Sequence, residues 1–345
     1  MKAKVLHIAF GQLLSLLIAC TGIASKTLEL RNASVPAFQS FFSYFFLAAI
    51  FTLYRYWNKM STSSRCGGVH EATVEMWIYA VIAIMDVQAN FLVLTAFRYA
   101  NFATVAILLH MTVPIVTFLN CVILEKRFAT CHYVGSAIAF LGCIIIFVSH
   151  FDSDYNSSEE VKGDLMVILC AFLYSCCNIG EEFCVSSGGN QAGNNYLCFM
   201  GSFAAFFTAI QLRTLEWDAF HSIVWSPMVY VGFAGYTLSI FLFYALGSVF
   251  FRIADSLLFN ISLLTADVFT MIASYVFFNE PVSKYYYIAL VLNGIGIYIY
   301  SLQDPEESKE IKSVRKGSLL KYSISEILEY QTPESINQSS INITK

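Results

Sequence analysis

Charged residues are scarce in this sequence. Asp, Glu, Lys and Arg together make up 13% of the 345 residues, whereas hydrophobic residues make up 57%. Soluble globular chains carry roughly 25% charged residues, so this composition excludes a water-soluble fold, which could not bury so much apolar surface. The net charge is only −4, and no long run of one sign interrupts the apolar body. Nothing therefore indicates a nucleic-acid partner.

Motifs of catalysis and metal binding are also missing. No Cys-x-x-Cys pair occurs, and no His stands at zinc-ligand spacing from a Cys, so we expect neither a metal nor another cofactor. Gly-x-Ser-x-Gly and His-Glu-x-x-His are absent, and the glycine-rich segment 186–191 lacks the Gly-Lys-Ser/Thr ending of a phosphate-binding loop. These absences favour a carrier that does not use ATP over an enzyme.

The sequence does contain a series of apolar runs long enough to cross a bilayer, which takes roughly 20 residues. Ten such runs lie near residues 5–24, 36–54, 74–97, 103–124, 131–149, 165–185, 196–212, 227–251, 254–278 and 285–302. Turn-rich stretches separate them. Segment 304–345 is polar, which predicts a disordered cytosolic tail. We therefore predict an all-α integral membrane protein with about ten transmembrane helices.

A weak internal repeat divides the apolar body. The segment 96–101 is echoed by 250–255, and each leads into an apolar run that ends at an acidic corner, 125–127 or 279–281. Halves of five helices would insert in opposite orientations, because five is odd, and many secondary transporters have this plan. The repeat predicts one five-helix unit over 1–152 and an inverted second unit over 153–303.

Few polar side chains interrupt the apolar runs. Ionisable groups inside a span are costly and usually face an interior path or a partner. Three sets are spaced to share one helical face, and together with Glu181 and the lone His110 they are the candidates for the walls of a central solute-binding cavity. The sets are Asp86 with Asn90, Tyr174 with Asn178 and Glu182, and Asn260 with Asp267. Asp267 and Asn260 lie well inside their run, and Glu182 is a weaker candidate. The alternative is that these groups only hydrogen-bond helices together or meet water at the interface.

Both halves of the chain contain distinctive motifs: 11–18 (GQLLSLLI), 86–90 (DVQAN), Asn178 with Glu181-Glu182, and 260–267 (NISLLTAD). With these motifs the chain resembles the F-type branch of solute carrier family 35, within the drug/metabolite transporter superfamily, from about Gly11 to Ser301. The resemblance implies ten helices in two inverted five-helix repeats, a retained first helix, cytosolic termini and alternating access around a central cavity.

One departure from the family bears on solute choice. The resemblance implies a glutamine and an aspartate in the fourth helix, where this chain has Ala106 and Leu109, followed by His110. Better-known members of the family exchange nucleotide sugars, and nucleoside-like or nucleobase-like solutes are equally compatible with this branch. We predict a secondary transmembrane transporter of a small organic solute. A non-transporting membrane receptor or trafficking adaptor is the alternative. A homodimer, and the choice between plasma membrane and Golgi or endosomal membranes, stay open.

Charge near the span ends predicts the topology. More Lys and Arg flank the side that holds both termini, which makes that side cytosolic. The glycosylation sequons at Asn32 and Asn156 fall on the opposite side. We expect glycosidase treatment to shift the mobility of the wild type, with the shift reduced in Asn32→Gln or Asn156→Gln. A tag on the tail that outside protease cannot reach, in sealed vesicles with their cytosolic face outward, would contradict this orientation.

Overall fold

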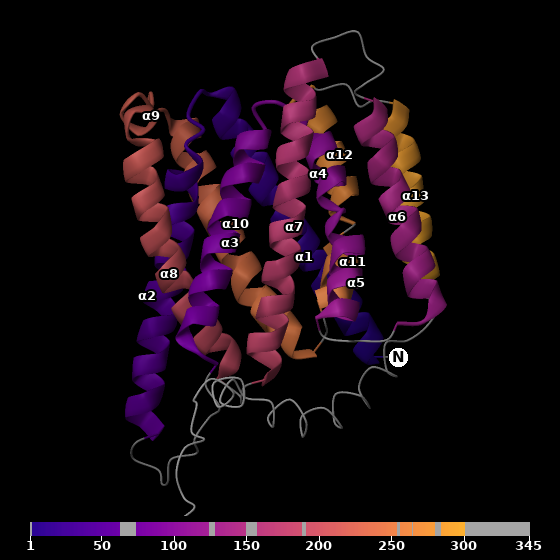
Figure 1. Ribbon diagram of the computed structural model, residues 1–345. Coiled ribbons are helices and arrows are strands. Elements are labelled where there is room, and N and C mark those ends of the chain that lie inside the picture. The colour runs from indigo at the N-terminus through magenta and orange to yellow at the C-terminus, as the bar shows by residue number, and fades with distance from the viewer. Residues whose placement is uncertain are drawn as a thin grey trace, which may run out of the picture.

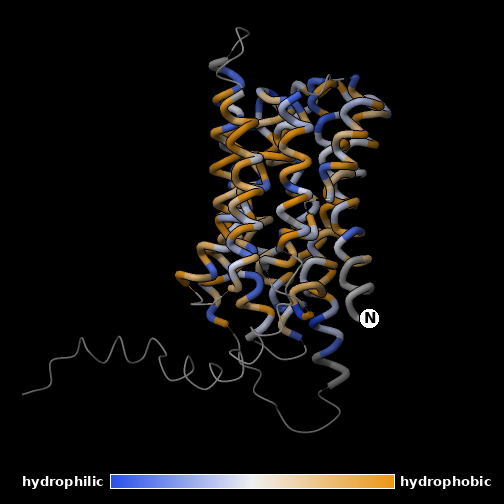
Figure 2. The backbone as a smooth tube through the Cα atoms, turned by 90° about the vertical axis from the view of Figure 1, so that its right-hand side faces the viewer, coloured by the Kyte–Doolittle hydropathy of each residue, from blue (hydrophilic) through white to orange (hydrophobic). Residues whose placement is uncertain are grey.

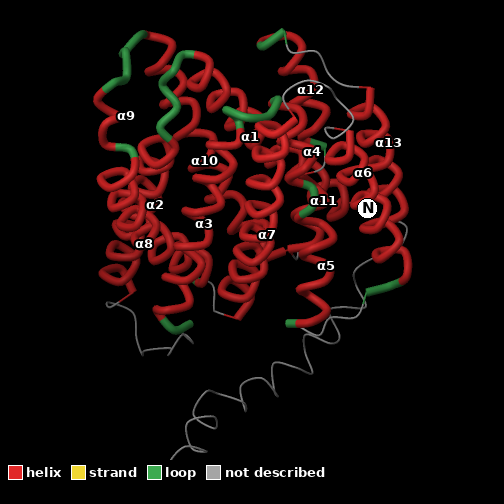
Figure 3. The backbone as a smooth tube through the Cα atoms, turned by 45° about the horizontal axis from the view of Figure 1, so that its top comes forward, coloured by secondary structure: helices red, strands yellow, loops and turns green. Residues whose placement is uncertain are grey.

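The computed structural model describes residues 2–62, 74–123, 128–149, 157–187, 191–253, 256–263, 265–279 and 284–300. All regular structure in these ranges is helical, and short loops join the helices (Figure 3). In chain order the helices are α1 (Lys2–Leu30), α2 (Pro36–Thr62), α3 (Met76–Ala96), α4 (Phe102–Leu109), α5 (Thr112–Val122), α6 (Thr130–Ser149), α7 (Ser157–Ser187), α8 (Ala192–Leu215), α9 (Trp217–His221), α10 (Pro227–Ile253), α11 (Ser256–Leu263), α12 (Ala266–Phe277) and α13 (Lys284–Tyr300).

Within these ranges the helices form one upright bundle (Figure 1). Nine stretches are long and apolar enough to cross a membrane, with α4 and α5 forming one of them and α11 and α12 another. Helix α13, with 17 residues, stands beside α6 as the tenth. Each stretch coincides with one of the ten predicted apolar runs. Helices are the natural result, since backbone groups in hydrocarbon must be satisfied within their own segment.

The fourth span is interrupted at its middle. The sequence predicts one run over 103–124 with a kink at Pro114, but the helix breaks four residues earlier, at His110 and Met111. Proline lacks the N–H that would bond the carbonyl of residue i−4, and its ring crowds that carbonyl. The carbonyl of His110 instead accepts the N–H of Val113 at 2.9 Å. The proline therefore accounts for a break at His110.

The ninth span is also interrupted, which the sequence did not predict. Helix α11 ends at Leu263 and α12 begins at Ala266. No proline lies nearby. Side chains of α1 fill the break: the Ser15 hydroxyl donates to the Ser262 carbonyl at 2.7 Å, and Gln12 donates to the Thr265 hydroxyl at 2.9 Å. The Ser15 hydroxyl thus gives the Ser262 carbonyl a donor that an unbroken helix would supply internally, while Gln12 contacts the Thr265 side chain beside it.

The helices pack in a pairwise pattern. Helix α2 packs on α8 and α6 on α13, while α3 packs on α7 and α1 on α10. Counted as spans, these are pairs two–seven, five–ten, three–six and one–eight. If spans one to five are exchanged with spans six to ten in order, the same four pairs result. The packing is therefore what two related five-helix halves would give, and the division at residue 152 remains a prediction.

The bundle places apolar groups outside and polar groups inside. Large apolar side chains project outward from several helices, among them Trp57, Phe118, Val231 and Tyr275, each more than 60% exposed. Hydrophobic residues predominate along the middle of the helices, and hydrophilic residues are more frequent toward both ends (Figure 2). The largest fully buried side chains include the tyrosines Tyr44, Tyr196, Tyr236 and Tyr286. An exposed apolar belt of this extent is suited to lipid contact.

One predicted glycosylation site lies in the described ranges. Asn32 is exposed in the connection between α1 and α2, with a φ of 53°. Asparagine tolerates this left-handed conformation, which commonly ends helices. The other sequon, Asn156, and the predicted tail 304–345 lie outside the described residues. The exposure of Asn32 is compatible with modification there.

Two glycines in α13 allow a matched test of its packing on α6. A Cβ at Gly296 would lie 2.8 Å from the carbonyl oxygen of Gly135, whereas a Cβ at Gly294 would meet nothing within 4 Å. We expect Gly296→Ala to lower the free energy of unfolding by about 1–3 kcal/mol, because backbone must move. Gly294→Ala should leave it unchanged or raise it. Chemical denaturation in detergent measures both, and equal effects would contradict the α6–α13 contact.

Candidate functional site

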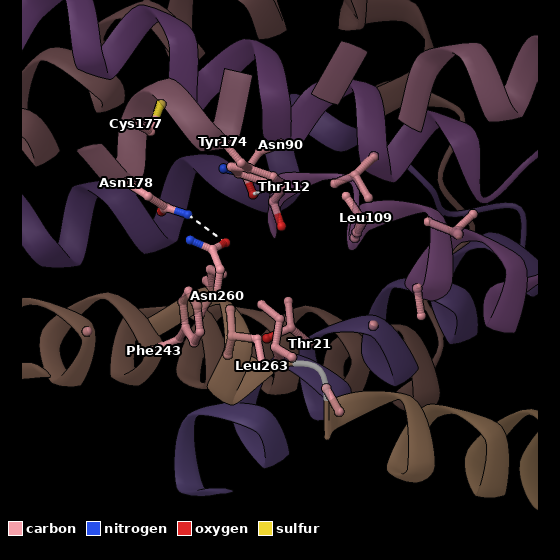
Figure 4. A pocket seen from close by; sticks show the side chains of 18 of the residues that line it. Thr21, Asn90, Leu109, Thr112, Tyr174, Cys177, Asn178, Phe243, Asn260 and Leu263 are labelled. Carbon is pink, nitrogen blue, oxygen red and sulfur yellow. Dashed lines mark hydrogen bonds between the residues drawn. The ribbon is translucent and has the colours of Figure 1, made fainter. Parts of the chain in front are cut away.

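A cavity of about 170 Å³ lies at the centre of the bundle. Helices from both ends of the chain line it, including α1, α3, α4, α7, α10, α11 and α12. Polar side chains project into it from opposite walls (Figure 4). Eight of the nine sequence-predicted residues line this cavity: Asp86, Asn90, His110, Tyr174, Asn178, Glu181, Asn260 and Asp267. The ninth, Glu182, does not.

One polar cluster surrounds Asp86. Its Oδ2 atom accepts the hydroxyls of Tyr44 at 2.5 Å and Tyr244 at 2.6 Å. Asn90 lies one turn further along α3 and donates to the same oxygen at 3.2 Å, while its own carbonyl accepts the Tyr174 hydroxyl at 3.0 Å. These donors come from α2, α3, α7 and α10. Asp86 is thus a fully buried carboxyl group whose position is fixed by phenol and amide donors.

A second cluster forms where the two interrupted spans meet. His110, just beyond the end of α4, places its Nδ1 atom 3.1 Å from Oδ2 of Asp267, in the first turn of α12. Asn293 of α13 contacts both, at 3.1 Å from the imidazole nitrogen and 3.5 Å from the carboxyl oxygen. The Tyr286 hydroxyl donates to the backbone carbonyl of Asp267 at 3.1 Å. The breaks in the fourth and ninth spans therefore bring the imidazole of His110 and the carboxyl group of Asp267 together.

A third pair crosses the cavity. Asn178 of α7 donates to the Asn260 side-chain carbonyl at 3.1 Å, and Figure 4 draws this bond between the two facing walls. Asn260 also donates to the backbone carbonyl of Ser256 at 2.6 Å. Both amides border the open space next to Phe243 and Tyr174. The pair offers hydrogen-bond donors and acceptors that a solute could replace.

Glu182 occupies a different place from the one predicted. Its Oε2 atom accepts the backbone N–H of Ser256 at 3.0 Å and the hydroxyl of Ser256 at 2.8 Å. It therefore binds the first residue of α11 instead of lining the cavity. Helix geometry explains the difference: each four-residue step from Tyr174 rotates about 40° past a full turn, so Glu182 faces about 80° away. Glu181, seven residues from Tyr174, returns to nearly the same face.

Sequence reasoning missed the partners of the buried carboxyl groups. Tyr44, Tyr236, Tyr244, Tyr286 and Asn293 all contact the clusters. The chain has 20 tyrosines, most of them in apolar runs, and no local pattern separates these from lipid-facing ones. Asn293 could have been found, since it is an amide inside the apolar run 285–302.

The electrostatic character of the cavity is acidic. Its lining includes three carboxyl side chains, Asp86, Glu181 and Asp267, and the imidazole of His110. No Lys or Arg is among the described residues that line it. A site of this kind can accept hydrogen bonds from a solute and can neutralise a cation, but it has no fixed positive charge to pair with a phosphate group.

Comparison with known proteins identifies the family. The sequence model of solute carrier family 35, type F, matches residues 1–302, nearly all of the apolar body. The chain belongs to the F-type branch of solute carrier family 35. The resemblance seen in the sequence motifs is confirmed, as is the all-α integral membrane fold of the drug/metabolite transporter class. The protein is therefore a multi-pass membrane protein of a solute carrier family.

Individual relatives agree with this assignment. Solute carrier family 35 member F2 of Mus musculus is 26% identical over 311 residues, which cover 87% of this chain and 81% of the relative. An uncharacterized solute carrier family 35 member of Schizosaccharomyces pombe is 28% identical over 317 residues, but the match covers only 60% of that longer protein. A solved crystal structure superposes with a TM-score of 0.60 at 14% identity, over 86% of this chain and 96% of that one.

The two adjacent glutamates of this family 35 chain should respond differently to truncation. Glu182→Ala leaves the N–H and hydroxyl of Ser256 without that acceptor, so we expect a loss of about 1–3 kcal/mol in the free energy of unfolding. Glu181→Ala should cost less, because it removes the acceptor of one group only, the Tyr196 hydroxyl, and the buried Oε1 atom of Glu181 has no hydrogen-bond partner among the described residues. Denaturant titration of both variants in detergent provides the comparison. A larger loss for Glu181→Ala would contradict these assignments.

Proposed function

We propose that this protein is a secondary carrier that moves a small, uncharged or cationic organic solute by alternating access. A nucleobase-like solute fits the proposal best, and a nucleoside-like solute is the larger alternative. The observation that carries it is the central cavity, with polar groups on opposite walls and no Lys or Arg among its described lining residues. Family membership supports the carrier class, and the cavity supports the choice of solute.

The charge of the cavity argues against a nucleotide sugar. A diphosphate group needs cationic or convergent N–H partners to compensate for its lost hydration. The described lining supplies three carboxyl groups and a histidine that already faces Asp267. Burying a diphosphate beside carboxylates would add like-charge repulsion. An uncharged heterocycle avoids both costs.

The apolar part of the lining fits a flat ring. Phe97, Phe102, Phe243 and Phe259 contribute aromatic surface to the cavity. Aromatic faces stack on rings, while a few amides and hydroxyls fix the orientation, as in most small-molecule sites. The volume of about 170 Å³ is below the roughly 300–1,000 Å³ of pockets for drug-sized ligands. These features favour a solute of about the size of a nucleobase, which is smaller than a nucleoside.

Alternating access requires two parts that can move about the cavity. Helices α1, α3 and α4 from the predicted first half and α7, α10, α11 and α12 from the second half all contribute to its wall. Rocking of two repeats about a central site is the common mechanism of carriers built in this way. Hydrogen bonds across the cavity, such as Asn178 to Asn260, would be exchanged for bonds to the solute.

Uptake by purified protein in liposomes tests the function. We would supply a labelled mixture of nucleobases, nucleosides and nucleotide sugars, with and without ATP. The expected result is uptake of uncharged solutes without ATP and no uptake of nucleotide sugars. Uptake of a nucleotide sugar would contradict the electrostatic argument, and flux that requires ATP would contradict a secondary carrier.

Asn260 provides the site-specific test. We expect Asn260→Ala to reduce uptake by at least about tenfold, the equivalent of about 1.4 kcal/mol of solute binding, because the solute loses one hydrogen-bonding group on the wall. Asn194→Ala is the matched control, since Asn194 lies near the start of α8 and bonds Gln191 outside the cavity. Unchanged uptake in Asn260→Ala at normal abundance would mean that the amide only joins helices.

A further inference from the structure

The contact between His110 and Asp267 is, among the described residues, the one imidazole–carboxyl contact that joins the two interrupted spans. Both side chains are buried, with Asp267 0% exposed and His110 7% exposed. They lie 157 positions apart in the chain (267 − 110), one after the end of α4 and the other at the start of α12. Any rearrangement that separates α4 from α12 must therefore break the contact between His110 and Asp267.

The two helix ends favour opposite charges at this contact. The carboxyl end of a helix stabilises a cation and the amino end stabilises an anion. His110 follows the carboxyl end of α4, while Asp267 lies in the first turn of α12. A protonated imidazole beside an ionised carboxylate is the arrangement that matches both helices. With the imidazole neutral, the carboxylate leaves a net negative charge buried in the bundle.

Asp267 has unused hydrogen-bonding capacity. Its Oδ1 atom and the Oδ1 atom of Asn293 are buried without a hydrogen-bond partner among the described residues. Leaving a buried carboxylate oxygen without a donor costs free energy, and the cost is larger when the group carries an uncompensated charge. A structural ion pair would be expected to have its remaining oxygen satisfied. An unsatisfied one fits a group that changes its partner or charge during function.

Other titratable groups surround the pair. From α6, the Cys143 thiol donates to the Ile107 carbonyl at 3.4 Å and interacts electrostatically with Asp267, and from α13 the Tyr286 hydroxyl bonds the Asp267 carbonyl. Those that line the same cavity from α3, α7, α8 and α10 are Asp86, Tyr174, Cys177, Glu181, Tyr196, Tyr236 and Tyr244. The described lining residues of α1 are Ile18, Thr21, Gly22 and Ser25, which do not titrate in this range. None of the groups around the pair carries a fixed positive charge.

We infer that His110 and Asp267 form a proton-binding site, and that the carrier moves one proton together with its solute. A proton from water on one side adds to the neutral imidazole of His110, which contacts both Asp267 and the Asn293 amide, and gives an imidazolium–carboxylate pair with no net charge. The pair then adds no net charge to the cavity wall, and the cavity can close around an uncharged solute. After the halves rock, the same proton leaves the imidazole to water on the other side. This inference rests on the proposed carrier function.

Rapid pH jumps on reconstituted protein test the proton site without any solute. Proteoliposomes adsorbed on a solid-supported membrane are switched from about pH 8 to about pH 5, a range in which histidine ordinarily titrates. Proton entry to a site inside the membrane field produces a transient charge displacement. We expect this displacement in the wild type and its loss in both His110→Gln and Asp267→Asn, which keep side-chain size and hydrogen bonding.

Matched controls lie outside the membrane-spanning helices. Glu216, between α8 and α9, accepts the Ala37 N–H at 2.7 Å, and burial raises the pKa of its carboxyl group to about 7. Its protonation falls in the same pH range but at the end of the bundle, so Glu216→Gln should leave the displacement unchanged. His221 is exposed in α9, and His221→Gln is the corresponding histidine control.

Coupling is measured in the same liposomes with an internal pH-sensitive dye. Adding the mixture of nucleobases and nucleosides outside should acidify the interior in the wild type but not in Asp267→Asn. If the wild type shows no charge displacement after the pH jump, the inference is wrong. It is also wrong if both His110→Gln and Asp267→Asn keep the displacement. Solute uptake without proton entry overturns coupling. If no solute enters, the carrier function fails, and the displacement alone still decides whether the pair binds a proton.

Discussion

Backbone and side-chain polar groups inside a bilayer must find partners within the protein, and the two interrupted spans are where this constraint is hardest to meet. Pro114 frees the carbonyl of His110 in one span, and α1 stabilises the other break through Ser15. Because α4 ends where α12 begins, the breaks supply both the polar cavity and opposite helix ends for His110 and Asp267. The location of the site thus follows from the positions of the breaks.

The two central carboxyl groups meet the same constraint in different ways. Asp86 is held by phenol and amide donors that carry no charge of their own, and the donors come from several helices. Asp267 faces an imidazole that can gain or lose a proton, and one of its oxygens is unsatisfied. The first arrangement fixes a group in place, whereas the second can change its net charge. A binding wall and a proton site can therefore coexist in one small cavity.

Hydropathy was sufficient to predict the ten spans, because each must contain a long apolar run whatever its neighbours are. It could not predict the break after Leu263, since this depends on Ser15 and Gln12 of α1, some 250 residues away in the chain. Eight of the candidate residues line the cavity, and they could be selected from the sequence because polar groups are rare in such runs. Glu182 was assigned to the wall from four-residue spacing alone, which accumulates rotation over two steps. The tyrosine partners depend on helix packing and gave no local signal.

The replacement of polar residues in the fourth span has a definite place in this arrangement. Ala106 and Leu109 both line the cavity in the last turn of α4, immediately before His110. The family resemblance implies a glutamine and an aspartate at these positions, whereas this chain has two apolar side chains there. With leucine at position 109, His110 has Asp267 as its carboxyl partner, and the small apolar surface beside it favours a solute with less polar area on that side.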